Sequence, residues 1–211
     1  MSSASRLLHV GCGPKHIAQT TRFFREGNWQ ETRLDIDPDV RPDVIGSLTD
    51  MSAIPSGSMQ AVFSSHNIEH LYPHEVPKAL AEMRRVLDES GVLVLTCPDL
   101  QSVAQLVADD KLLEPAYHAP AGPIAPLDIL YGHRPAMAAG NLFMAHRCGF
   151  TLRVLMGVLR QAGFAGLAGL RRPESFDLWV VASVGVRTED EMKALLLAQF
   201  VLPQAGGAQH G

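Results

Sequence analysis

Three side chains that could carry acid–base chemistry lie close together in the middle of the chain. His66, Glu69 and His70 occur within five consecutive positions. On a helix, residues three and four positions apart share one face, so the three side chains would meet if this segment is helical. Imidazole titrates near neutral pH, and either histidine could therefore remove a proton from a hydroxyl or amine nucleophile.

A turn with two glycines and a carboxylate further along the chain could together bind a nucleoside. Gly11 and Gly13 follow a short apolar run, and a backbone without Cβ atoms lets a ligand approach closely. His16 stands where a GxGxxG motif has its third glycine, which argues against a pyrophosphate-bearing NAD site. Asp35 lies 22 residues after Gly13, and a carboxylate at the end of a strand can accept two hydrogen bonds from a ribose diol.

The pattern of apolar residues predicts strands that alternate with helices. Expected strands cover residues 7–10, 32–36, 43–46, 60–64, 92–97 and 178–184, and expected helices cover residues 74–88, 151–162 and 189–200. Such alternation is typical of an α/β fold whose mostly parallel sheet is covered by helices on both faces. Ligands bind beyond the carboxyl ends of the strands in these sheets, so the loops after the first, second, fourth and fifth strands should line one crevice.

Residues 98–150 interrupt this alternation. The segment is rich in proline and carries the side chains of Tyr117, His118, Tyr131, His133, Arg134, His146 and Arg147. A long irregular connection in a compact domain is usually a binding loop or a lid, and we expect this insertion to fold over the crevice as a substrate lid. Arg134 and Arg147 could then clamp a carboxylate or phosphate, while Tyr131, His133 and His146 could add hydrogen bonds.

The chain has the size and composition of one folded domain. Its 211 residues are 46% hydrophobic and 19% charged, so we expect a single domain over residues 1–202 and a flexible tail at 203–211. The net charge of −4 disfavours broad binding to nucleic-acid phosphates. The apolar runs are too short to cross a bilayer, and the N-terminus has no signal-peptide pattern. We therefore expect a cytoplasmic protein that binds neither nucleic acid nor membrane.

The cysteines indicate no cross-link and no thiolate metal site. Cys12, Cys97 and Cys148 are widely spaced and form no CxxC pair. We expect all three thiols to be reduced and mostly buried.

Four ordered segments resemble the motifs of a known class of enzymes. They read LLHVGCGPK, GNWQETRLDIDPDV, DVIGSLTDMSAIPSGSMQAVFSSHNIEHL and ALAEMRRVLDESGVLVLTCPDL. A fifth segment, FTLRVLMGVLRQAGF, resembles the same class more weakly. They are similar to class I S-adenosylmethionine-dependent methyltransferases, in particular to the small bacterial methyltransferases of the type 11 family. The resemblance extends from about residue 7 to residue 100. It implies a Rossmann-like, doubly wound, mostly parallel sheet of seven strands, with S-adenosylmethionine as the cofactor.

The resemblance also implies a set of cofactor-binding residues, namely His9, Gly11, Cys12, Gly13, Asp35, Ile36, Ser47, Leu48, Ser65 and His66. The glycine turn would approach the methionine part of the cofactor, Asp35 would hold the ribose hydroxyls and Ile36 would pack on the adenine. Ser47 and Leu48 fall at the adenine edge. Ser65 and His66 would lie beside the sulfonium and its methyl group. The family often carries an acidic residue where His9 stands, and an aspartate where Ser47 stands; Asp50 is a candidate substitute for the latter.

Three interpretations of the cluster at residues 66–70 stay open. The first is structural, because a Glu-His pair at this place recurs in the resembled family without an obvious catalytic duty. The second is acid–base catalysis by His66 or His70. The third is a divalent metal site, completed by His146 or His133, because a few methyltransferases hold an ion with a similar cluster. We take His66, Glu69, His70, Tyr131 and His146 as candidate catalytic residues and assign no metal ligand.

The expected function is transfer of a methyl group from S-adenosylmethionine to a small molecule. The chain carries no accessory domain and no basic groove, which favours a small acceptor over a macromolecule. Exposed apolar residues in the region 100–150 would suit a homodimer. Two alternatives remain. One is a nicotinamide-dependent oxidoreductase on a related nucleotide-binding fold, and the other is a non-catalytic cofactor-binding module, for which the departures at His9 and Ser47 leave room.

Overall fold

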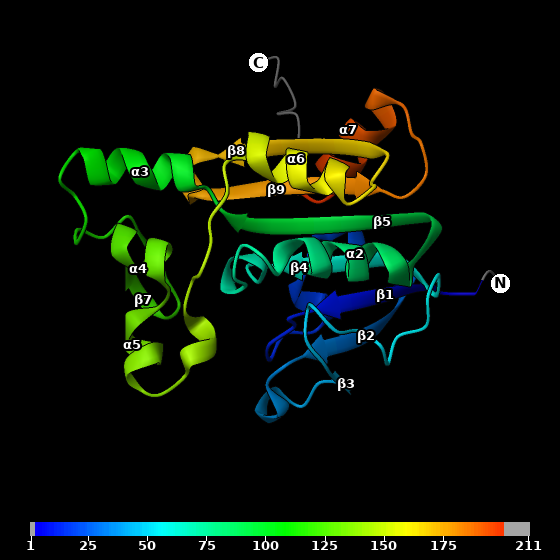
Figure 1. The fold of residues 1–211 in the computed structure, drawn as a ribbon, viewed down its shortest axis with the longest axis horizontal. Helices are drawn as coiled ribbons and strands as arrows, with labels where there is room; N and C mark the ends of the chain where they lie inside the picture. The colour runs from blue at the N-terminus through cyan, green and yellow to red at the C-terminus, as the bar shows by residue number, and fades with distance from the viewer. Residues whose placement is uncertain (1–2, 201–211) are drawn as a thin grey trace, which may run out of the picture.

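A seven-stranded sheet forms the centre of the molecule (Figure 1). The computed structural model describes residues 3–200. The sheet consists of β1 (Ser5–Val10), β2 (Trp29–Asp35), β3 (Val44–Ile45), β4 (Met59–Ser65), β5 (Leu87–Pro98), β8 (Gly166–Arg172) and β9 (Asp177–Ser183), in the order β3-β2-β1-β4-β5-β9-β8. The first five strands are parallel, and β9 pairs antiparallel with both β5 and β8. The prediction of a mostly parallel, seven-stranded α/β sheet is confirmed.

Helices cover both faces of this sheet. Successive residues of a strand point to opposite faces, and in the central strands the residues on both faces are apolar and must be buried. On one face, Val62 of β4 and Leu93 of β5 pack with α2 (Val76–Val86) and α6 (Leu152–Gln161); Figure 1 shows both helices in front of the sheet. On the other face, Phe63 and Val94 pack with α1 (Arg22–Glu26) and α7 (Glu189–Leu197). All four of these strand residues are at most 6% exposed, so the sheet is a rigid platform for the loops at its carboxyl edge.

Helix α6 has the boundaries that its terminal residues favour. The Thr151 side chain accepts a hydrogen bond from the Val154 N–H at the start of the helix. Gly163 follows the end of the helix with a φ of 89°, a left-handed conformation that favours glycine. The helix predicted over residues 151–162 is confirmed.

The structure adds one strand to those that the sequence pattern predicted, and it settles the conformation of residues 66–70. Strand β8 was not among the predicted strands, because its sequence GLAGLRR has no alternation of apolar and polar residues; its pairing with β9 makes it an edge strand. The segment at residues 66–70 is not an α-helix. His66 has a φ of 56°, and only η3 (Ile68–His70), a single 3₁₀ turn, follows it.

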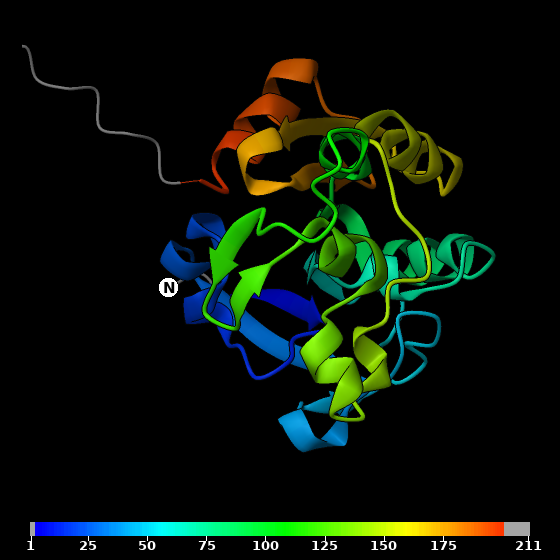
Figure 2. The same cartoon turned by 90° about the vertical axis from the view of Figure 1, so that its left-hand side faces the viewer.

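The insertion at residues 98–150 is built of short elements rather than irregular chain. It contains α3 (Leu100–Ala108), the hairpin β6 (Tyr117–Ala119) and β7 (Gly122–Ile124), α4 (Pro126–Tyr131), α5 (Arg134–Ala138) and η4 (Leu142–Met144). Val103, Ile124 and Ile129 form a small apolar core of its own. Figure 2 shows the insertion projecting from the carboxyl edge of the sheet toward the viewer.

The insertion is tied to the sheet by polar contacts at its start. Asp99, which is fully buried, accepts hydrogen bonds from the Gln101 N–H and the Ser102 hydroxyl and so caps α3. Arg171 of β8 donates from Nε to the same carboxylate at 2.8 Å. Within residues 3–200 no helix has the length and apolar character that crossing a bilayer requires. The tail expected at 203–211 lies outside the described residues.

Candidate active site

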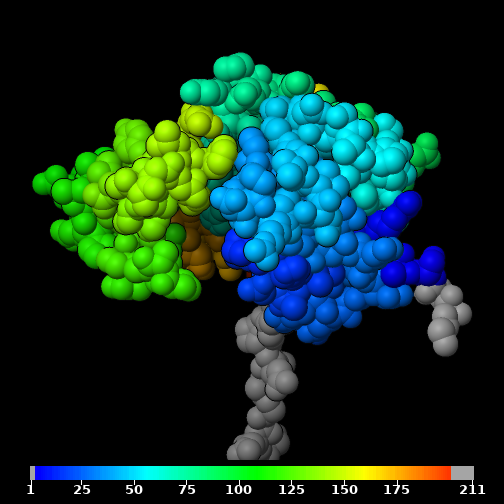
Figure 3. Space-filling model, turned by 90° about the horizontal axis from the view of Figure 1, so that it is seen from below, coloured from blue at the N-terminus to red at the C-terminus, as the bar shows by residue number. Residues whose placement is uncertain are grey.

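The main cavity lies at the carboxyl edge of the sheet, between the N-terminal half of the chain and the insertion. Figure 3 shows it as a hollow between the blue surface of the first strands and the yellow-green surface of the insertion. Its volume is about 750 Å³, within the range that holds a cofactor or a drug-sized ligand. Side chains from both parts of the sequence line it, including His9, Cys12, Asp35, Ile36, Ser47, Leu48, Ser65, His66, His70, Asn141, Phe143, Met144, Arg147, Arg172, Trp179 and Phe200.

The glycine turn after β1 has a left-handed backbone conformation at both glycines, and at Gly11 the surroundings also leave no room for a side chain. Gly11 and Gly13 have φ values of 62° and 52°. A Cβ atom on Gly11 would lie 2.1 Å from the Asn67 Oδ1 atom, whereas one on Gly13 would meet no protein atom within 4 Å. The backbone at Gly13 is therefore open to the cavity, which is the cradle expected for a ligand that approaches the main chain closely.

Asp35 points toward this turn. Its Oδ2 atom accepts a hydrogen bond from the Gly13 N–H at 2.7 Å, and its Oδ1 atom accepts one from the Asp37 N–H at 3.0 Å. Both Asp35 and the glycines line the same cavity. The structure thus brings together the carboxylate and the bare backbone that the sequence placed 22 residues apart.

Two further charged residues of β2 hold the same turn, and sequence reasoning missed both. Glu31 accepts hydrogen bonds from the His9 ring at 2.8 Å and from the Ile17 N–H at 2.9 Å. Arg33 donates to the Gly13 carbonyl at 2.6 Å and to the Lys15 carbonyl at 3.0 Å. The sequence nevertheless indicates both residues. Glu31, Arg33 and Asp35 lie at every second position of one strand, so their side chains share one face of the sheet.

His9 stands where the resembled family often has an acidic residue, and it has an acidic partner of its own in Glu31. Its side chain is buried and Glu31 supplies a carboxylate beside it. Burial lowers the pKa of His9, although the hydrogen bond and charge of Glu31 oppose this shift. Glu31 thus places a carboxylate next to His9, although Glu31 itself does not line the cavity.

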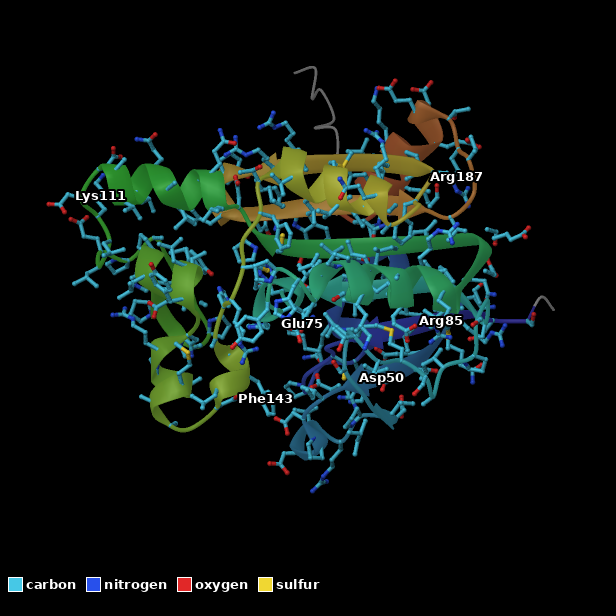
Figure 4. The ribbon with its side chains drawn as sticks, viewed as in Figure 1. Asp50, Glu75, Arg85, Lys111, Phe143 and Arg187 are labelled. Carbon is cyan, nitrogen blue, oxygen red and sulfur yellow. The ribbon has the colours of Figure 1, made fainter. Side chains whose placement is uncertain are left out.

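The adenine-edge candidates line the same cavity. Ile36, Ser47 and Leu48 all face it, and Ile36 is 48% exposed. Asp50 accepts a hydrogen bond from the Ser52 N–H and does not line the cavity; Figure 4 shows it in the turn beyond β3. Asp50 is thus not positioned to replace the aspartate that the family often has at the position of Ser47.

Ser65 and His66 lie between the glycine turn and the insertion. The Ser65 hydroxyl lies 2.9 Å from the Thr96 hydroxyl. The His66 side chain is 47% exposed to the cavity, and its Nδ1 atom lies 3.4 Å from Oε1 of Glu69. Burial among protein atoms lowers the pKa of His66, but the contact with Glu69 outweighs this effect and raises the pKa overall. A bulky residue in the left-handed region is strained, and such strain is concentrated at functional sites.

Glu69 is buried directly behind His66. Its side chain is 1% exposed, and neither carboxylate oxygen has a hydrogen-bond partner among the described residues. His70 and His146 lie next to it. Burial raises the pKa of Glu69, but the three neighbouring histidines outweigh burial and lower it overall. Burial lowers the pKa of His146. The structure therefore brings together four of the five candidate catalytic residues.

The fifth candidate, Tyr131, lies elsewhere. Tyr131 lines a second cavity of about 180 Å³, which it shares with His146 and Arg147. Arg134 also lies away from the main cavity, where it pairs with Asp128 within the insertion. Of the two arginines expected to clamp a substrate, only Arg147 lines the main cavity.

Aromatic side chains that the sequence did not single out form the remaining wall. Trp179 of β9 and Phe200 pack together with ring centres 4.8 Å apart, and the Arg172 guanidinium lies 5.1 Å from the Trp179 ring centre. Arg172 is also paired with Asp177. Phe143 of the insertion also lines the cavity, and Figure 4 shows it on the edge of the insertion that faces the sheet.

Comparisons with known proteins agree with this geometry. Residues 8–95 match a family model described as a methyltransferase domain. A search of curated proteins gives no match. Among solved structures, an S-adenosylmethionine-dependent methyltransferase from Archaeoglobus fulgidus shares 15% identity, with 85% of this chain and 86% of that chain covered and a TM-score of 0.56.

Two other solved structures have the same fold. A protein from Pyrococcus horikoshii is 14% identical, with 85% and 82% of the two chains covered and a TM-score of 0.58. A 1,6-didemethyltoxoflavin N1-methyltransferase from Burkholderia thailandensis, solved with S-adenosylhomocysteine, is 14% identical, with 86% and 72% covered and a TM-score of 0.53.

The fold, the family match and the cavity together define the class. The match of residues 8–95 to a methyltransferase domain, together with a fold shared with S-adenosylmethionine-dependent methyltransferases, supports a class I methyltransferase that uses S-adenosylmethionine as its cofactor. The predictions of class, fold and cofactor are confirmed, and neither the oxidoreductase nor the non-catalytic module is needed to account for the site.

Proposed function

We propose that the protein methylates a small molecule that binds between His66 and the insertion, with residues 98–150 acting as a substrate lid. One continuous cavity carries this proposal, because it joins the glycine turn and Asp35 at one end to His66 and the insertion at the other. The cavity volume of about 750 Å³ suits a cofactor together with a small molecule, which supports a small acceptor.

The residues at the glycine-turn end of the cavity fit S-adenosylmethionine. The open backbone at Gly13 would cradle the methionine part, Asp35 would accept hydrogen bonds from the ribose hydroxyls, and Ile36 would pack on the adenine. When bound, S-adenosylmethionine supplies an electrophilic methyl group on a sulfonium. The protein's main task is then to align the attacking atom, because orientation alone can contribute roughly 7–11 kcal/mol to a displacement of this kind.

The end of the cavity between His66 and the insertion, where the acceptor would bind, favours an anionic molecule. Arg147 lines the cavity and donates from Nη1 to the His70 carbonyl at 2.7 Å. Its guanidinium also lies 5.0 Å from the centre of the Tyr72 ring, and none of the ion pairs among the described residues involves Arg147. We propose that Arg147 binds a carboxylate or phosphate of the acceptor and that His66 contacts the attacking atom.

Methyl transfer to a panel of small molecules tests this proposal. Radiolabelled S-adenosylmethionine should label anionic members of the panel and leave their neutral analogues unlabelled. Replacement of Arg147 with methionine should raise KM for the acceptor without changing the Kd of S-adenosylhomocysteine. Replacement of Arg153, an exposed arginine on α6, is the matched control. Equal labelling of neutral and anionic compounds would contradict the anionic acceptor.

Location and assembly are part of the proposal. All three cysteines are free, which supports a reducing compartment such as the cytoplasm. A homodimer stays a prediction, for which exposed Leu113, Tyr131 and Leu142 on the insertion offer an apolar surface. Sedimentation equilibrium of the full chain would decide between monomer and dimer.

A further inference from the structure

Within the described residues, the buried carboxylate of Glu69 has one ion-pair contact, 3.4 Å from its Oε1 atom to Nδ1 of His66. It is 1% exposed, and both oxygens lack hydrogen bonds within the described part of the chain. Removing a carboxylate from water is costly unless hydrogen bonds or a cation compensate it. The nearest positively charged candidates are histidines, and the backbone carbonyl of Glu69 is already engaged by the N–H groups of Arg147 and Cys148.

Two of these histidines are oriented by backbone carbonyls. Nδ1 of His70 lies 3.1 Å from the Ala145 carbonyl oxygen, and Nδ1 of His146 lies 2.8 Å from the Ile129 carbonyl oxygen. A carbonyl oxygen can only accept, so each Nδ1 carries the hydrogen. Neutral rings in this tautomer leave Nε2 with a free lone pair. A histidine that donates one ring N–H to a carbonyl and presents the other nitrogen is the usual form of a metal ligand.

The potential ligand atoms converge. One atom each from Glu69, His70 and His146 lie within 4.8 Å of one another. Ligand atoms bound to one ion at about 2.0–2.2 Å can be at most about 4.4 Å apart, so small side-chain rotations would close the three around an ion.

We propose that Glu69, His70 and His146 form a binding site for a divalent transition-metal ion. Two imidazoles and one carboxylate are a ligand set typical of zinc and iron sites with open coordination positions. His70 lines the main cavity and His146 lines the smaller one, so the ion would lie between the two cavities.

The site would also connect two parts of the chain. Glu69 and His70 belong to the turn after β4, whereas His146 belongs to the insertion. A bound ion therefore holds the insertion against the sheet. This inference goes beyond methyl transfer, because binding of the ion requires neither cofactor nor acceptor.

Titration of the metal-free protein tests the proposal. After removal of metals with a chelator, Zn²⁺ should bind with one-to-one stoichiometry in calorimetry and raise the unfolding temperature. Co²⁺ at the same site should give visible absorption bands of a nitrogen- and oxygen-ligated ion. Glu69→Gln and His146→Gln should each weaken binding by at least about tenfold, since even the loss of a group that only orients a ligand costs that much.

Controls separate this inference from misfolding and from the proposed function. His118→Gln changes an exposed histidine of the β6–β7 hairpin and should leave the affinity for Zn²⁺ unchanged. Thermal unfolding and the Kd of S-adenosylhomocysteine show whether each variant is folded, and His70→Gln replaces Glu69→Gln if the latter does not fold. Absence of one-to-one binding, or binding that folded His70→Gln and His146→Gln variants retain at full strength, would overturn the metal site while leaving the methyltransferase intact.

Discussion

Asp35 fixes the glycine turn, and its carboxylate has the capacity to bind a ligand as well. Its two oxygens already accept the N–H groups of Gly13 and Asp37, which fixes the glycine turn. An ionised carboxylate has about four lone-pair sites, so each oxygen retains capacity for a ribose hydroxyl. The side chain that shapes the cradle can therefore also hold a ribose, as we propose.

Replacement of Asp35 with alanine should weaken cofactor binding. Loss of a buried hydrogen-bonding partner costs about 1–3 kcal/mol, which corresponds to roughly five- to 150-fold in Kd. Calorimetry with S-adenosylhomocysteine measures this change, and Asp39→Ala, at an exposed position outside the cavity, is the matched control. An unchanged affinity in the Asp35 variant would refute its role.

At the scale of helices and strands, the parts of the site that regular elements position could be predicted from the sequence. The glycine turn and Asp35 were predictable because each follows a regular strand, and the carboxyl ends of parallel strands meet at one edge. Glu31 and Arg33 could have been found from their alternation with Asp35 along β2. The short elements within 98–150 could not, since segments of three to nine residues are too short for a periodic pattern to reveal.

The insertion depends on Asp128 for its internal structure, and its stability should therefore depend on pH. Side-chain hydrogen bonds from Arg134 lower the pKa of Asp128 to about 2, against the opposing effect of burial. A carboxyl whose pKa is lowered on folding from the ordinary value of 3.8 stabilises the folded state above about pH 4. That contribution disappears as the pH falls toward 2.

Asp128→Asn should consequently lower the unfolding temperature at pH 7 and lose this effect at acidic pH. Thermal unfolding of the wild type and the variant between pH 7 and pH 2 would measure it. Glu189→Gln removes an exposed ion pair with Lys193 and should change little at any pH. A difference between the Asp128 variant and the wild type that stays constant down to pH 2 would contradict the ion-pair explanation.

On the scale of the whole molecule, the site joins segments far apart in sequence. The Arg147 N–H donates to the Glu69 carbonyl at 2.8 Å, and Gly132 and Ala145 form an isolated bridge within the insertion. These contacts bring His146 to Glu69. Nothing in the spacing of either segment indicates the other, so the sequence could name His146 as a candidate but could not place it beside Glu69.

Cofactor binding should stabilise the entire domain. A ligand at 100 times its Kd stabilises the folded state by about 2.7 kcal/mol, which for a chain of this size raises the unfolding temperature by roughly 5–11 °C. S-adenosylhomocysteine should produce this shift in thermal unfolding, and NADH at the same concentration should not. Equal shifts with both compounds would favour a general nucleotide site.

The most direct test of the account is a crystal structure of the protein with S-adenosylhomocysteine. The ribose hydroxyls should lie within hydrogen-bonding distance of the Asp35 carboxylate, with the methionine part against the backbone of Gly11 and Gly13 and the sulfur beside Ser65 and His66. Electron density for the ligand outside this cavity, or a ribose turned away from Asp35, would contradict the central claim.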